Sequence, residues 1–80
     1  MTTTKRTFRA IAIEIKATWK NIYFGAEPYL RALYKLDTTD PQAPYYLDTA
    51  ETIVRYFLAN ASAFRGPEAK RLKNELKSMI

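Results

Sequence analysis

The chain has 80 residues, which limits it to one domain because so short a chain cannot bury two separate cores. Its hydrophobic fraction of 48% and aromatic fraction of 14% exclude the polar, highly charged compositions of disordered proteins. It contains neither histidine nor cysteine, which excludes thiol chemistry, zinc–thiolate sites and the commonest catalytic base.

The net charge of +5 is unevenly distributed along the chain. Residues 1–20 are mainly basic, residues 37–54 contain acids and no base, and residues 55–80 are again mainly basic. Such an order suits an anionic ligand at one face, or pairing of one copy's acidic loop with another copy's basic end. A domain this small that lacks disulfides also gains from association, so we expect a homo-oligomer.

The first residues contain no long apolar run and no cleavage signature, so we expect neither a signal peptide nor a membrane span. The absence of cysteine permits a reducing compartment, and the cytoplasm fits best. We therefore expect one domain over residues 1–80, with residues 1–6 flexible.

Four helical segments are predicted. The first runs from Thr7 to about Asn21, although three alternating isoleucines also fit a strand; nearby alanines and the length of the pattern favour helix. Its apolar face has the three-and-four spacing of a helix. The face consists of Phe8, Ile11, Ala12, Ile15 and Trp19.

Gly25 interrupts the chain, and Pro28 suits the first turn of a second helix that runs to about Leu36. Residues 37–47 contain two prolines and are predicted to be the main loop. The apolar face of the second helix consists of Tyr29, Leu30, Leu33 and Tyr34.

Asp48 and Glu51 have the spacing of a capping box, so the third helix is predicted to start there and to stop near Gly66. Its broad apolar stripe predicts the central, most buried helix. The stripe consists of Ala50, Ile53, Val54, Phe57, Leu58 and Ala61.

Gly66 and Pro67 then open a fourth helix, whose narrow stripe predicts a position at the surface of the bundle. That stripe consists of Ala69, Leu72, Leu76 and then Met79 or Ile80. The expected fold class is all-α, a compact bundle of about four short helices.

The aromatic residues fall into two groups. Trp19, Tyr23, Phe24, Phe57 and Phe64 are expected to fill the core. Tyr45 and Tyr46 lie in the proline-bounded loop, where they either cover a partner or hold the loop in place, and the sequence favours neither.

Catalytic groups are scarce. The carboxylate pairs Asp37 with Asp40 and Asp48 with Glu51 have turn or cap contexts that explain them structurally. The two glycines belong to no phosphate-binding loop motif. We expect no enzymatic activity, no cofactor and no metal site.

Basic residues gather around the fourth helix: Arg65, Lys70, Arg71, Lys73 and Lys77. Cations beside a helix N-terminus can hold a phosphate. They can equally be the solvated face of an amphipathic helix, partly offset by an Arg71–Glu75 pair.

Three runs, WKNIYFGAEPYL (19–30), IVRYFLANASAF (53–64) and GPEAKRLKNELK (66–77), resemble a group of small bacteriophage and prophage proteins of unassigned function. The chain departs from that pattern at Phe64, where tryptophan is frequent, and at Pro67 after the glycine. The resemblance implies a phage setting and carries no residue roles.

Small phage proteins without catalytic groups commonly act by occupancy, an argument by association. We expect a counter-defence protein in the host bacterial cytoplasm that sequesters an anionic nucleotide immune signal or blocks a host defence protein. The expected ligand-binding residues are the cations Lys16, Lys20, Arg65, Lys70 and Arg71 together with Tyr45 and Tyr46. The alternatives are a nucleic-acid-binding accessory protein, suggested by the pI of about 9.6, and a self-associating assembly protein.

Overall fold

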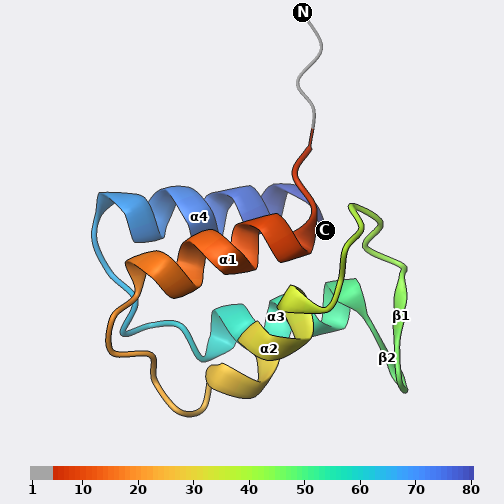
Figure 1. Cartoon of the computed structure of the whole chain (residues 1–80), viewed down its shortest axis with the longest axis horizontal. Helices are drawn as coiled ribbons and strands as arrows, with labels where there is room; N and C mark the ends of the chain where they lie inside the picture. The colour runs from red at the N-terminus through yellow and green to blue at the C-terminus, as the bar shows by residue number, and fades with distance from the viewer. Residues whose placement is uncertain (1–4) are drawn as a thin grey trace, which may run out of the picture.

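Four helices surround one core in the computed structural model, which describes residues 5–80 (Figure 1). The all-α prediction is confirmed, with one small addition: the predicted loop contains the first strand of an antiparallel hairpin. The helices are α1 (Phe8–Thr18), α2 (Glu27–Tyr34), α3 (Ala50–Ala59) and α4 (Pro67–Ser78), and the strands are β1 (Pro44–Tyr45) and β2 (Asp48–Thr49).

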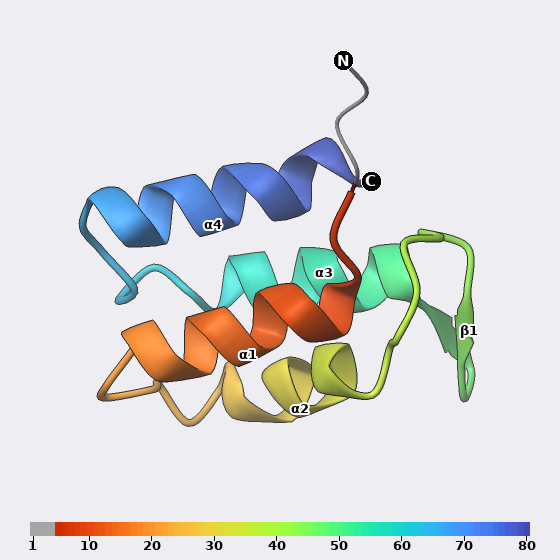
Figure 2. The same cartoon turned by 45° about the horizontal axis from the view of Figure 1, so that its top comes forward.

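The helices pack in a closed order, in which α1 and α3 each contact both α2 and α4 (Figure 2). Every helix turns its predicted apolar stripe toward the common core, except that Tyr34 at the end of α2 faces outward. The largest fully buried side chains are Phe8, Phe57, Ile11, Ile15, Leu33, Leu72, Leu76 and Val54. The prediction that α3 is the central, most buried helix does not distinguish it from α1, because each of the two helices buries four side chains and contacts both α2 and α4.

The starts of three helices follow from local chemistry. Thr7 caps α1, where its side-chain oxygen accepts a hydrogen bond from the Ala10 N–H at 3.1 Å. Pro28 and Pro67 occupy the first turns of α2 and α4, where a missing N–H leaves no bond unmade. Gly66 precedes α4 with φ of 108°, a conformation open to glycine and disfavoured for other residues.

The predicted capping box at α3 is wrong by one residue. Asp48 belongs to β2, where it pairs with Tyr45, so the cap passes to Thr49, whose hydroxyl accepts from the Thr52 N–H at 3.3 Å. Glu51 instead pairs with Arg55 one turn on, at 2.8 Å. The helix also ends at Ala59, well before Gly66, and a turn carries the chain to α4.

Three aromatic side chains predicted to face the core are exposed instead. Tyr23 and Phe24 lie in the turn between α1 and α2, where helical spacing no longer decides which side chains point inward, and Phe24 is 79% exposed. Tyr34 ends α2 and is half exposed, beneath the Arg9 guanidinium at 5.3 Å from the ring centroid. Trp19 and Phe64 are buried as predicted and stack with ring centroids 4.9 Å apart.

The segment from residue 36 to 43 joins the beginnings of α1 and α3. The first N–H groups of a helix have no partner within that helix, and here carbonyl oxygens of this segment accept from four such donors. The bonds are Phe8 to Thr38 (3.0 Å), Arg9 to Leu36 (3.0 Å), Ala50 to Ala43 (2.9 Å) and Glu51 to Pro41 (2.8 Å).

Within the start of the chain predicted to be flexible, residues 1–6, Arg6 makes several polar contacts. Its guanidinium donates two hydrogen bonds to Glu75, at 2.6 and 2.9 Å, and one to Glu14 at 2.8 Å. Lys5 is exposed, and residues 1–4 of that prediction lie outside the described residues. In the described part of the chain, no helix is long and apolar enough to cross a membrane.

Candidate anion-binding site

The last helix, α4, presents three chemically different faces. Its buried face, Ala69, Leu72 and Leu76, packs into the core, which requires the polar residues to lie around the rest of the helix. A second face carries charged side chains that pair with Glu14 of α1 and with Arg6 just before it, and a third carries the lysines. The paired and unpaired cations of α4 are therefore separated by the geometry of the helix.

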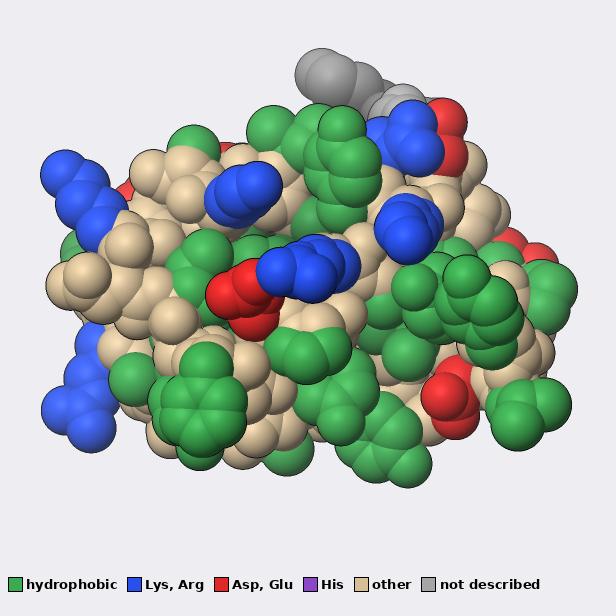
Figure 3. Space-filling view, turned by 60° about the horizontal axis from the view of Figure 1, so that its bottom comes forward, with side chains coloured by type: hydrophobic (Ala, Val, Ile, Leu, Met, Phe, Trp, Pro, Cys, Tyr) green, Lys and Arg blue, Asp and Glu red, His purple; other side chains and the backbone are tan. Residues whose placement is uncertain are grey.

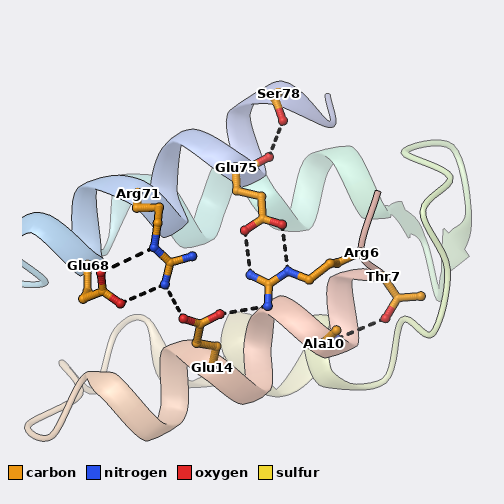
Figure 4. A network of polar contacts seen from close by, with 8 residues as sticks. All are labelled: Arg6, Thr7, Ala10, Glu14, Glu68, Arg71, Glu75 and Ser78. Carbon is orange, nitrogen blue, oxygen red and sulfur yellow. Dashed lines mark hydrogen bonds and ion pairs between the residues drawn. The ribbon is translucent and has the colours of Figure 1, made fainter. Parts of the chain in front are cut away.

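The paired face contains a chain of alternating charges (Figure 4). Glu14 of α1 accepts from both Arg6 and Arg71, and Arg71 also donates to Glu68 at 2.9 Å. Glu75 is bound by Arg6, so the predicted Arg71–Glu75 pair is wrong. Two carboxylates hold the Arg71 guanidinium, so Arg71 is set apart from the unpaired cations of α4.

Acid is expected to weaken this network. The Arg71 and Arg6 guanidinium groups lower the pKa of Glu14 below its usual 4.5, Arg6 does the same for Glu75, and Arg71 for Glu68. A lowered folded-state pKa adds stability that is present above the unfolded value and lost as pH falls through the folded value.

We therefore expect the melting temperature to be nearly constant from about pH 5 to 8 and to fall below about pH 4.5, as measured by circular dichroism. Glu14→Gln removes the central carboxylate, so its melting temperature should be lower at neutral pH and should fall less on acidification. A wild-type protein whose stability is unchanged down to about pH 3 would contradict the network's contribution.

The basic residues on α4 and just before it that have no carboxylate partner in the described part of the chain form what we call the cationic patch: Arg65, Lys70, Lys73 and Lys77. Positions 70, 73 and 77 recur at helical spacing, so their side chains share one face of α4. The patch lines a shallow hollow with a volume of about 640 Å³, which Phe64, Gly66, Pro67 and Asn74 complete. Within residues 5–80, no member of the patch forms an ion pair.

Lys73 lies at the least solvated point of the patch. Its ammonium is 5.8 Å from the centroid of the Phe64 ring, and burial, followed by repulsion from Lys77 and Arg65, lowers the pKa of Lys73. Like charges one turn apart on a helix destabilise it. An anion in the hollow would relieve this repulsion, whereas the patch alone has no group that does so.

Of the predicted site residues, the structure places two, Arg65 and Lys70, on the hollow. Lys73 and Lys77 complete the patch, and their spacing from Lys70 was visible in the sequence. Lys20 is exposed just after α1 and lines neither the hollow nor the pocket between α1 and α2. The two predicted tyrosines belong to the hairpin, which lies at the end of the molecule opposite the turn into α4 (Figures 1 and 2).

The hairpin tyrosines have different environments. Tyr45 is partly buried and packs against the core, so it holds the loop in place. Tyr46 is 86% exposed and has only the edge of Tyr45 beside it, with ring centroids 4.8 Å apart. The sequence left open whether these tyrosines cover a partner or hold the loop in place. Tyr45 does the second, and Tyr46 is exposed enough to contact a partner.

Lys16, the last predicted site residue, lines a separate pocket between α1 and α2, which we call the α1–α2 pocket. Its volume is about 450 Å³. Figure 3 shows the side of the molecule that carries α2, with basic side chains across its middle and hydrophobic ones around them. The pocket is lined by Ala12, Lys16, Ile22, Glu27, Leu30, Arg31, Tyr34 and Lys35.

Within residues 5–80, no group of three or more acidic side chains is placed to hold a metal ion. Comparison of the chain with protein-family models, curated proteins and solved structures gives no match.

Proposed function

We propose that this protein is a non-catalytic binding protein that captures a small phosphate-bearing anion, of the nucleotide class, on the cationic patch. The observation that supports this most is the collection of four cations around one hollow without a carboxylate among its lining residues. Elsewhere within residues 5–80, the arginines are paired with carboxylates, as at Arg71, Arg55 and Arg31. A cluster of cations without carboxylate partners attracts anions electrostatically.

The length of the patch supports a small ligand. Lys70 and Lys77 are seven residues apart on a helix, so the row extends about 10 Å. That length suits two or three linked phosphate groups, and it is short for the extended backbone of a polymer. Lysine ammonium groups bind phosphate as point charges, and Arg65 adds a guanidinium that can contact two phosphate oxygens.

The biological setting we propose is phage counter-defence, in which the protein would sequester an anionic nucleotide signal inside the host bacterium. The support is the resemblance of residues 19–30, 53–64 and 66–77 to small phage and prophage proteins, together with the lack of histidine and cysteine.

Binding can be measured with a built-in reporter. Trp19 is the only tryptophan, and its ring stacks on Phe64, which lines the hollow. Titration with pyrophosphate and with ATP at low salt should change Trp19 emission and release heat in calorimetry, with saturation at one ligand per chain. Absence of saturable binding to both probes at millimolar concentration would overturn the proposal.

A second candidate is binding of nucleic acid, which the same row of lysines favours. A single-stranded oligonucleotide in the same titration separates the two functions. Affinity for a strand should fall linearly with the logarithm of salt concentration, with a slope of about −3 for four phosphate contacts. Saturable binding to the oligonucleotide without binding to pyrophosphate or ATP would favour this second function over the first.

A further inference from the structure

The tip of the hairpin has features that the isolated chain does not explain. Tyr46 and Leu47 form the connection between β1 and β2, and Tyr46 has φ of 55°. Glycine and asparagine are the usual residues in this left-handed region of a two-residue hairpin turn. A bulky aromatic residue there is strained, and Leu47 is as exposed as a residue in an extended chain. Both choices are unfavourable for a lone molecule.

The α1–α2 pocket has the complementary chemistry. Ala12, Ile22 and Leu30 provide apolar lining, and the ring of Tyr34 forms part of the wall. Lys16 and Lys35 lie at its edge and, within residues 5–80, form no ion pair. The one acid of the lining, Glu27, is bound by Arg31. The pocket thus combines an apolar interior with uncompensated positive charge.

We propose that the hairpin tip of one copy of this protein inserts into the α1–α2 pocket of a second copy. Leu47 and Tyr46 would enter the apolar interior, and Asp48, the next residue, would meet the two lysines. Asp48 is exposed and unpaired within residues 5–80, and it belongs to the stretch 37–54 that contains acids and no base. Polarity and charge are therefore complementary between two surfaces of the same chain.

The expected association is weak and sensitive to salt. A two-residue tip buries far less surface than a permanent interface, so the contact falls in the small, transient class. Its charge pairing lies at the rim, where added salt screens it. The two contacting surfaces are different, so the same contact can repeat from copy to copy unless the geometry closes it into a ring or a mutual exchange.

A charge exchange tests the inference. Sedimentation velocity of the wild type should show the mean mass rising with concentration up to about 1 mM at low salt, as expected of a small, transient interface. Asp48→Lys alone and the double variant Lys16→Glu with Lys35→Glu should each stay monomeric, because like charges then face each other. An equimolar mixture of the two variants should associate again, because each supplies the surface that the other can bind.

A second pair of variants separates the contact from stability. Tyr46→Gly relieves the strained φ and removes the ring, so it should melt at the same or a higher temperature and yet remain monomeric. Phe24→Ala, which removes another largely exposed ring outside the hairpin, should associate like the wild type. The inference is overturned if the wild type stays monomeric, if the charge-exchange mixture fails to associate, or if Tyr46→Gly associates normally. None of these results depends on the cationic patch.

Discussion

Phe57→Ala is expected to lower the free energy of unfolding by about 3 to 5 kcal/mol. The Phe57 ring is fully buried on α3, and its centroid lies 6.3 Å from that of Trp19 in an edge-on arrangement. Truncation removes the ring's burial and leaves a cavity that neighbouring helices fill only in part. A domain of this length has a total stability of roughly 4 to 12 kcal/mol, so the variant loses a large share of it.

Thermal melts followed by circular dichroism provide the measurement, with a fall in melting temperature of about 15 °C or more expected. The matched control is Phe24→Ala, because it deletes the same side chain at a position 79% exposed, and its melting temperature should stay within a few degrees of wild type. Equal losses in the two variants would show that the buried and exposed faces are wrongly assigned.

Lys70→Glu combined with Lys73→Glu is expected to weaken binding of pyrophosphate or ATP by about 100-fold or more. A hydrogen bond to a charged group contributes about 1.5 to 3 kcal/mol, so losing two of them exceeds the free energy of a 100-fold change. The same exchange removes like-charge repulsion along α4, so the variant should melt no lower than wild type. Calorimetry and Trp19 emission measure both the affinity and its loss.

The control for this variant is Lys16→Glu combined with Lys20→Glu, which changes the net charge equally but lies outside the patch. Its affinity for pyrophosphate should remain within about threefold of wild type, because distant exposed charges are screened. A loss as large as that of the patch variant would mean that net charge, and no defined site, attracts the anion.

The fold was predictable where local chemistry decides it. Apolar spacing located all four helices, and Pro28 and Gly66–Pro67 marked the starts of α2 and α4. The hairpin was not predictable, because two strands of two residues show no alternating pattern and the turn residue Tyr46 is atypical for its φ. Because the hairpin was missed, the cap of α3 was predicted at Asp48, one residue before its true position at Thr49.

The candidate site was predictable only in part. Sequence spacing placed Lys70 among a group of basic residues, but it could not show which of them would find a carboxylate. Arg71 is paired with Glu68, three residues earlier on α4, and also with Glu14, 57 residues earlier, which faces it across the contact between α1 and α4. Such a partner depends on how helices pack, and periodicity within one helix does not encode it.

The hydrogen bonds from segment 36–43 to the beginnings of α1 and α3 also bear on the motions of the protein. The four amide protons they involve are separated in sequence but depend on one short segment for protection from solvent. When that segment opens, the amides of Phe8, Arg9, Ala50 and Glu51 become accessible to deuterium together. The first turns of two helices are thereby coupled in their fraying, although no contact between those turns is needed.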